Sequence, residues 1–325
     1  MQEYVMGNGA IALGALAAGV NLVAGYPGTP SSEILETISK YRHDGVYIEW
    51  SVNEKAAMEV AAAAAYSGAR AMVTMKQVGL NVAADPLMSL AYVGVKGGMV
   101  IVSADDPGPI SSQTEQDTRR FADFCRIPVF DPSSPEEAYK MIGDAFEYSE
   151  KYNTPVLFRP TTRVCHAYAS IDNCDSPSPK KYEGFVKDSK KWVIFPRLSF
   201  ANHIMIEKRN VEIGKDFSTY SANKAEGRNS EKAVVTSGIS YAYTKECLKD
   251  YPDVKLIKIA TAYPFPEDFV LSSLEGTKEV LCIEELSPFI EEQILKLTGK
   301  HGLQLKVSGK LDGKVQAGGE NSTDK

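Results

Sequence analysis

The first 170 residues alternate between short apolar segments rich in β-branched residues and longer segments with helical periodicity. The expected strands are Leu22–Gly25, Val46–Trp50, Ala71–Met75, Met99–Ser103, Pro128–Phe130 and Val156–Arg159. The expected helices between them are Ala10–Ala18, Glu33–Lys40, Glu54–Ser67, Ala83–Val93 and Pro135–Lys151. Several strands are continuous apolar runs, as strands covered on both faces should be. The pattern predicts an α/β domain over residues 1–170 with a doubly wound, mostly parallel sheet.

The rest of the sequence divides into three parts. Residues 171–230 are rich in Lys, Asn, Ser and Asp, and we interpret them as a linker with one short helix at Ala201–Arg209. A second alternating pattern predicts a smaller α/β domain over residues 231–308. Its expected elements are strands Ala233–Thr236, Lys255–Ile259 and Val280–Ile283 and helices Tyr241–Lys249 and Pro288–Thr298. Residues 309–325 are polar and Gly-rich, which predicts a disordered tail.

Composition and charge argue against several functional classes. Acidic residues outnumber basic ones by 42 to 36, so no basic excess indicates a nucleic-acid partner. The most apolar window, residues 79–104, contains Asp85 and Lys96, which argues against a membrane span. The sequence does not start with a basic segment followed by an apolar run, so we expect a cytoplasmic protein.

Cysteine and histidine spacing argues against a metal site built by this chain. The five cysteines form no C-x-x-C pair, and the four histidines are far apart in the sequence. Iron–sulfur and zinc sites need closely spaced ligands of these types. We therefore expect this sequence to supply no metal ligands.

Polar, Gly- and Pro-containing segments follow four of the expected strands. Ligands of open α/β sheets bind at the carboxyl ends of the strands, where such segments meet. Each could also be an ordinary strand-to-helix turn. Four in succession favour one composite pocket rim. The segments are Gly25–Glu33, Ser51–Glu54, Met75–Asn81 and Asp105–Arg119.

Two of the motifs permit competing interpretations. The pattern S-x-x-E at Ser51–Glu54 is a capping box, in which Glu54 would reach back to the Ser51 amide. Alternatively, Glu54 faces the cleft and hydrogen-bonds a heterocyclic nitrogen. Residues 7–12 match the dinucleotide pattern G-x-G-x-x-A, but a full strand scarcely fits in the six residues before them. An N-terminal helix whose small residues allow close packing is the favoured interpretation.

Taken together, the motifs resemble a known family, the alpha subunits of indolepyruvate ferredoxin oxidoreductases within the 2-oxoacid:ferredoxin oxidoreductases. The resemblance extends in order to about residue 308. It implies a domain that binds the aminopyrimidine of thiamine diphosphate, followed by a domain like the transketolase C-terminal domain. The segments that carry it are GNGAIALGALAAGV, GYPGTPSSE, EWSVNEKAA, MKQVGLNVAADPLMSLAY, SADDPGPISSQTEQDTR, SGISYAY and AYPFPE.

The resemblance also implies roles for particular residues. Glu54 matches the family's catalytic glutamate, which contacts the pyrimidine N1′ and activates the cofactor. Thr29 matches a position near the substrate, and Arg119 matches an arginine that holds the substrate carboxylate. The implied cofactor-binding residues are Tyr26, Pro27, Gly28, Gly79, Leu80, Asn81, Ser111, Ser112 and Gln113.

The implied reaction needs components that this sequence does not encode. We find no motif for the diphosphate and Mg²⁺ or for iron–sulfur clusters, and expect these on a partner chain or on a further C-terminal region. The implied partners are a chain carrying the diphosphate site, a beta subunit and ferredoxin, with CoA and a 2-oxo acid as substrates. The implied activity is oxidative decarboxylation of indolepyruvate, or another aryl 2-oxo acid, to an acyl-CoA.

Three departures from the family pattern leave alternatives open. Gly9 stands where the family has glutamate, Gln77 where it has histidine, and Pro109 with Ile110 where it has Met-His. The same scaffold could therefore serve pyruvate or a branched-chain 2-oxo acid. It could also be a non-catalytic paralogue that keeps the fold and the partner surface.

Overall fold

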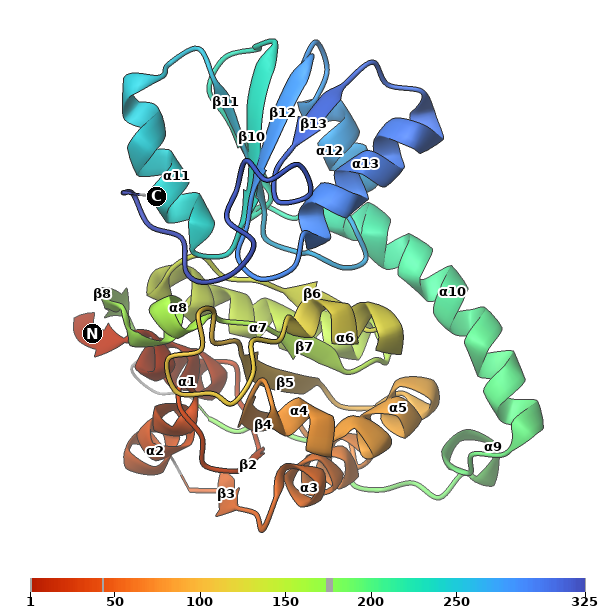
Figure 1. The fold of residues 1–325 in the computed structure, drawn as a ribbon. Helices are drawn as coiled ribbons and strands as arrows, with labels where there is room; N and C mark the ends of the chain where they lie inside the picture. Colours follow the sequence, from red (N-terminus) through yellow and green to blue (C-terminus); the bar gives the residue numbers. More distant parts are fainter. Residues whose placement is uncertain (1, 43, 174–177, 325) are drawn as a thin grey trace.

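A computed structural model describes residues 2–42, 44–173 and 178–324 and shows two α/β domains connected by a long helix (Figure 1). The first domain contains a six-stranded sheet in the order β3-β2-β4-β5-β7-β6, with every neighbouring pair parallel. This topology confirms the predicted fold class. The strands are β2 (Leu22–Gly25), β3 (Tyr47–Trp50), β4 (Ala71–Lys76), β5 (Met99–Ala104), β6 (Val129–Phe130) and β7 (Val156–Phe158).

Helices cover both faces of this sheet. Alternate strand residues point to opposite faces, so Met72 packs in one apolar cluster and Val73 in the other. The first cluster contains residues of α1, α2 and α7, and the second contains residues of α3, α4, α5 and α6. These helices are α1 (Gly7–Ala17), α2 (Ser32–Tyr41), α3 (Glu54–Tyr66), α4 (Gly79–Val82), α5 (Ala84–Val93), α6 (Thr118–Cys125) and α7 (Pro135–Tyr152).

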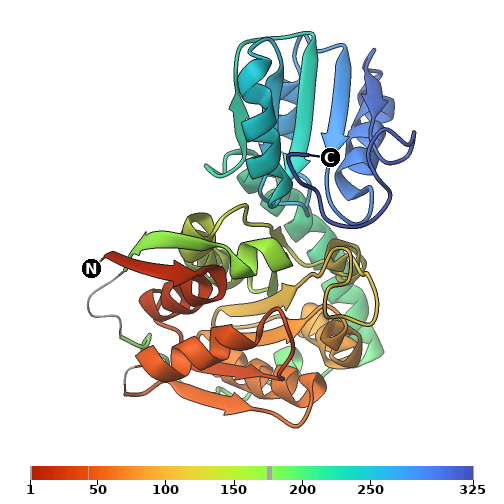
Figure 2. The same ribbon diagram turned by 60° about the vertical axis from the view of Figure 1, so that its left-hand side comes forward.

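The N-terminal glycines serve close helix packing. A Cβ atom on Gly7 would lie 1.8 Å from the Val164 carbonyl oxygen, and one on Gly14 would lie 2.3 Å from the Tyr139 carbonyl oxygen. A strand does precede them, contrary to expectation: β1 (Gln2–Met6) pairs antiparallel with β8 (Tyr168–Asp172), outside the main sheet (Figure 2). The short helix α8 (Thr162–His166) leads into β8. The G-x-G-x-x-A match is therefore a packing motif.

The predicted linker contains far more helix than expected. After α9 (Ser189–Trp192), helix α10 runs over Pro196–Ser218, where only Ala201–Arg209 was predicted. Its buried face includes Asn202 and Asn210, which hid the apolar periodicity. Burial is tolerated because the Asn202 amide donates to the Tyr92 carbonyl oxygen at 2.8 Å, and Asn210 donates to the Tyr263 hydroxyl at 3.2 Å. Residues 174–177 of this linker lie outside the described residues.

The second domain has a five-stranded sheet in the order β13-β12-β10-β11-β9. Its strands pair in parallel except β9, which pairs antiparallel with β11 and lies within the predicted linker. The strands are β9 (Lys224–Glu226), β10 (Lys232–Ser237), β11 (Lys255–Ile259), β12 (Glu279–Ile283) and β13 (Lys306–Ser308). The helices are α11 (Ser240–Cys247), the short 3₁₀ helix Leu248–Asp250, α12 (Glu267–Ser273) and α13 (Phe289–His301). No described helix has the length and apolar character needed to cross a membrane.

Disorder was predicted for residues 309–325, yet residues 309–324 follow a defined path along the boundary between the domains (Figures 1 and 2). Backbone hydrogen bonds to buried carboxylates explain this order. Glu291 accepts the N–H groups of Lys310 at 2.8 Å and Leu311 at 3.1 Å. Farther along, the Asn321 N–H donates to Glu285 at 2.9 Å. Composition could not reveal these acceptors, because they lie in other parts of the fold.

Candidate active site

Loops from the carboxyl ends of neighbouring strands meet at one edge of the first sheet. The Ser111 hydroxyl, in the loop after β5, donates to the Thr29 carbonyl oxygen after β2 at 3.2 Å. The same loop accepts a hydrogen bond from Lys76, at the end of β4, on Gln113 at 3.2 Å. The predicted rim is therefore a continuous structure in which three strand ends contact one another directly.

Glu54 lies at the start of α3, directly after the loop that follows β3. The N-cap of α3 is Asn53, whose side chain accepts the Ala56 N–H at 2.9 Å. The Ser51 N–H instead donates to the Gly25 carbonyl oxygen at 2.9 Å, so the capping box does not form. Glu54 is 8% exposed, and its carboxylate has no hydrogen-bond or ion-pair partner among the residues that the structure describes. The carboxylate oxygens are not among the fully buried polar atoms, so they are free to accept a hydrogen bond from a bound group, which makes Glu54 a candidate ligand-binding residue.

Gly79 makes room for this carboxylate. A Cβ atom at Gly79 would lie 2.5 Å from Glu54 Oε1 and 2.7 Å from Glu54 Cγ. Any side chain at position 79 would therefore displace the Glu54 carboxylate. The Glu54 carboxylate, in the first turn of α3, therefore packs directly against the backbone of Gly79 in the first turn of α4.

The arrangement fits the aminopyrimidine end of thiamine diphosphate. A heterocycle with a protonated ring nitrogen needs a hydrogen-bond acceptor in a largely dry site, and the unpartnered Glu54 carboxylate is such a group. Without a side chain at Gly79, the carboxylate has room in this position.

The structure places most of the other predicted site residues on the same rim. Leu80 is the exception, because its side chain is 1% exposed and packs in the apolar core. Gly79 is buried beside Glu54. The residues on the rim with exposed or half-buried positions are Tyr26, Pro27, Gly28, Thr29, Asn81, Ser111, Ser112 and Gln113.

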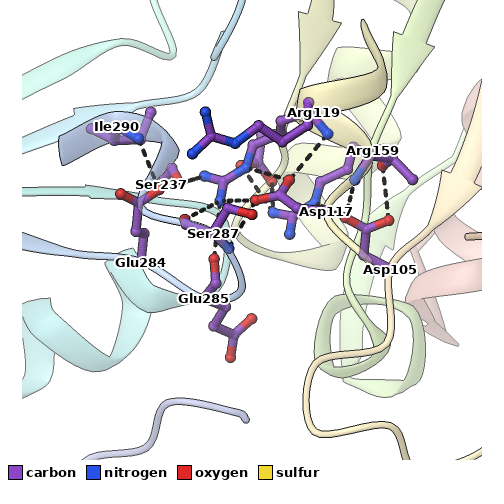
Figure 3. Close-up of polar contacts among 12 residues, drawn as sticks. Asp105, Asp117, Arg119, Arg159, Ser237, Glu284, Glu285, Ser287 and Ile290 are labelled. Carbon is purple, nitrogen blue, oxygen red and sulfur yellow. Dashed lines mark hydrogen bonds and ion pairs between the residues drawn. The ribbon is translucent and has the colours of Figure 1, made fainter. Parts of the chain in front are cut away.

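In this structure Arg119, the predicted carboxylate-binding residue, is committed to contacts within the chain. Arg119 is fully buried between the two domains (Figure 3), and acceptors surround all three of its nitrogens. Asp117 binds its Nε and Nη2 at 2.9 and 2.6 Å, and Glu284 of the second domain binds Nη1 at 2.9 Å. The remaining acceptors are the Ser237 hydroxyl and the carbonyl oxygens of Glu285 and Ser287. A guanidinium has five N–H groups, and none is left for a substrate.

Electrostatics support this structural role for Arg119. Burial alone would raise the pKa of the Asp117 carboxyl, but the charge and hydrogen bonds of Arg119 together with the charge of Arg159 bring that pKa below its ordinary value. Arg159 extends the network to Asp105 at 2.7 Å. Sequence reasoning could not find these pairs, because Glu284 is 165 residues away from Arg119 in the chain.

Two buried polar residues lie behind the rim: Gln77, which the sequence marked only as a departure from the family pattern, and Asp106, which it gave no individual role. The Gln77 side chain is 1% exposed, and the Asp106 side chain is also buried. Burial would raise the pKa of the Asp106 carboxyl, but hydrogen bonds from the Ser111 and Ser112 N–H groups and the Thr162 hydroxyl bring it below its ordinary value. For Asp106 the signal in the sequence was the acidic pair Asp105-Asp106 directly after an apolar strand. Among the described residues no group of three or more His, Cys, Asp or Glu side chains could hold a metal ion.

A doubly wound parallel sheet followed by a second α/β domain is the arrangement expected for the pyrimidine-binding half of a thiamine-diphosphate protein. A family model described as "Pyruvate flavodoxin/ferredoxin oxidoreductase, thiamine diP-bdg" matches residues 13–226. The chain belongs to this family.

Curated relatives and solved structures agree with this assignment. The chain is 42% identical over 315 residues to indolepyruvate oxidoreductase subunit IorA of Thermococcus kodakarensis, covering 94% of this chain and 49% of the relative. It is also 42% identical to the IorA subunit of Methanothermobacter thermautotrophicus, covering 95% of this chain and 51% of that protein. The chain thus spans about half the length of the curated relatives that it matches.

Two solved structures share the fold at low sequence identity. The 2-oxoglutarate:ferredoxin oxidoreductase from Magnetococcus marinus superposes with a TM-score of 0.75 at 17% identity, covering 95% of this chain and 62% of that chain. A split-gene transketolase superposes with a TM-score of 0.60 at 13% identity, covering 93% and 86%. The likeness to transketolase agrees with the expected nature of the second domain.

Proposed function

We propose that this chain forms the pyrimidine-binding half of the active site in a thiamine-diphosphate-dependent 2-oxoacid oxidoreductase. The observation that carries the proposal is the Glu54 carboxylate, which belongs to a residue that is only 8% exposed, has no partner among the described residues and lies against Gly79. When bound, thiamine diphosphate supplies a carbon nucleophile for the carbonyl group of a 2-oxo acid. In this proposal Glu54 accepts a hydrogen bond from the pyrimidine ring nitrogen and so holds the proton whose position controls the basicity of the ring.

The substrate that we propose is indolepyruvate or another aryl 2-oxo acid, with CoA as acyl acceptor and ferredoxin as electron acceptor. The names of the relatives that are 42% identical support this choice. In this proposal Thr29 and the loop around Ser111, which contact each other, form the wall beside the substrate. Pyruvate and branched-chain 2-oxo acids are the alternative substrates.

The rest of the site is proposed to come from another chain or region that bears the diphosphate-binding site and Mg²⁺, with a beta subunit and iron–sulfur clusters completing the enzyme. The rim carries an apolar surface suited to such a partner. Tyr26 and Trp50 are each 40% exposed, Ile110 is 57% exposed and Val52 is 84% exposed. Exposed apolar groups clustered around a ligand site are typical of an association surface.

Reconstitution tests this proposal. Thiamine diphosphate should bind the isolated chain weakly in calorimetry, because Mg²⁺ and the diphosphate contribute much of the binding and need oxygen ligands. Adding the chain or region with the diphosphate site should produce tight binding and oxidation of 2-oxo acids. Tight, Mg²⁺-dependent binding by the isolated chain would contradict the half-site. Equal turnover of pyruvate and indolepyruvate would contradict the aryl preference.

The substitution Glu54→Gln tests the role of the carboxylate in the reconstituted enzyme. The variant should fold normally but lose most exchange of the cofactor C2 proton, by at least 100-fold, since general acid–base groups contribute roughly 10²–10⁴-fold. Nuclear magnetic resonance of the bound cofactor measures this exchange directly. Glu59→Gln, at an exposed position on the same helix, is the matched control and should exchange like the wild type. Exchange at the wild-type rate in Glu54→Gln would show that Glu54 does not activate the cofactor.

A further inference from the structure

The loop over residues 105–117 has an unusual internal support. It forms no helix and no strand beyond one isolated bridge at Asp105, although it forms most of the rim after β5. Ordering a segment of this length costs conformational entropy at each residue, so specific contacts must hold it. One buried side chain from a different strand end provides contacts at both ends of the loop.

That side chain is the amide of Gln77. Its Oε1 accepts the N–H of Asp106, at the start of the loop, at 2.9 Å. Its Nε2 donates to the carbonyl oxygen of Thr114, near the end of the loop. The backbone N–H of Gln77 donates to the Ala104 carbonyl oxygen at 3.0 Å, which anchors the residue to β5. Both polar atoms of the amide are therefore committed to the loop backbone, eight residues apart in the chain.

Asp106 fixes the middle of the same loop. Its carboxylate accepts the N–H groups of Ser111 at 2.9 Å and Ser112 at 3.0 Å, and the Thr162 hydroxyl at 2.8 Å. Gln77 thus hydrogen-bonds the backbone of Asp106, the residue whose side chain fixes the loop at Ser111 and Ser112. The curled segment is the part that contacts Thr29 across the rim.

We propose that Gln77 is a positioning residue that sets the conformation of loop 105–117 and thereby the wall of the site at Ser111–Gln113. The position requires one donor and one acceptor on the same side chain, and a carboxamide supplies both at every pH. A neutral imidazole also supplies one of each, whereas an imidazolium has only donors and an ionised carboxylate has only acceptors. Gln77 therefore makes the loop conformation independent of pH near neutrality.

Hydrogen exchange of the full chain tests this role without any catalytic assay. Mass spectrometry would follow peptides from residues 105–117 in the wild type, Gln77→Leu and Gln77→His, corrected for intrinsic exchange at each pH. Gln77→Leu should exchange at least tenfold faster in this loop while strands β4 and β5 stay protected. Gln77→His should match the wild type at pH 8 and exchange tenfold faster at pH 5.5, when the imidazole is protonated. Gln304→Leu, at an exposed glutamine of the second domain, is the control and should change nothing.

Two outcomes would overturn the inference. One is wild-type exchange of the loop in Gln77→Leu, and the other is a Gln77→His loop that exchanges alike at both pH values. Circular dichroism melting of each variant separates loop opening from global unfolding.

The effect on the site wall rests on the proposed function and has its own readout. In the reconstituted enzyme, Gln77→Leu should raise KM for the 2-oxo acid with a smaller change in kcat, and Gln77→His should show that rise only at low pH. An unchanged KM alongside faster loop exchange would remove the effect on the site wall. A wild-type complex that turns over no 2-oxo acid would refute the proposed function and leave the exchange result standing.

Discussion

At the scale of single residues, the boundary between the domains concentrates buried carboxyl groups. Glu285 is 4% exposed and accepts only a backbone N–H, from Asn321 at 2.9 Å, among the hydrogen bonds of the described residues. Burial raises the pKa of this carboxyl to about 7, against the opposing effects of that N–H and of Arg159. In the folded chain Glu285 therefore keeps a proton that the unfolded chain releases near pH 4.

The raised pKa of Glu285 predicts how stability depends on pH. Its contribution is fully present below about pH 4 and is lost as the pH rises through about 7, because the folded state binds more protons over that range. Glu285→Gln should raise the free energy of unfolding at pH 8 relative to the wild type and leave it nearly unchanged at pH 4.5. Urea titrations at both pH values check this, with Glu279→Gln at an exposed position of β12 as the control. A variant that is destabilised equally at both pH values would contradict the prediction.

At the scale of secondary-structure elements, an aromatic cluster fixes the end of α10 to the first domain. Phe217 is fully buried, and its ring centroid lies 5.4 Å from that of Phe130 and 5.2 Å from that of Tyr148. Phe217→Ala should lower the free energy of unfolding by roughly 3–5 kcal/mol, the usual cost of deleting a buried aromatic ring. Phe200→Ala on the same helix, where the ring is 71% exposed, should change it by less than about 0.5 kcal/mol. Denaturant titration measures both, and equal costs would show that the packing of Phe217 is not what stabilises α10.

A comparison of the elements shows which parts of the fold could be predicted from the sequence. The strands of the first sheet could be located from sequence because buried parallel strands are continuous apolar runs, and β2 coincides with the predicted Leu22–Gly25. Helix α10 was mostly missed because Asn202 and Asn210 occupy its buried face. The position of Glu54 at a strand end was predictable, whereas the burial of Arg119 was not, since Glu284 lies far away in the sequence.

At the scale of the whole molecule, the two domains share a buried ion network centred on Arg119. Replacing Arg119 by Met removes the cation and leaves the carboxylates of Asp117 and Glu284 buried together. Breaking a buried pair in this way costs roughly 3–5 kcal/mol, so the variant should unfold at a lower temperature and lose the coupling between domains. Calorimetry is expected to show one transition for the wild type and two for the variant. Arg197→Met, exposed on α10, is the control, and a single unshifted transition in Arg119→Met would contradict the prediction.

The path of residues 309–324 gives the rim a mechanical link to the second domain. Glu115 in the rim loop accepts the N–H groups of Gly108 at 3.1 Å and Gly319 at 2.8 Å. One carboxylate therefore hydrogen-bonds both the loop and the C-terminal segment. Two residues later, Asn321 bonds to the Ser240 hydroxyl at 2.9 Å at the start of α11. A rotation of the second domain would therefore pull on the loop that carries Ser111. The position of the rim loop is therefore coupled, through residues 309–324, to the position of the second domain.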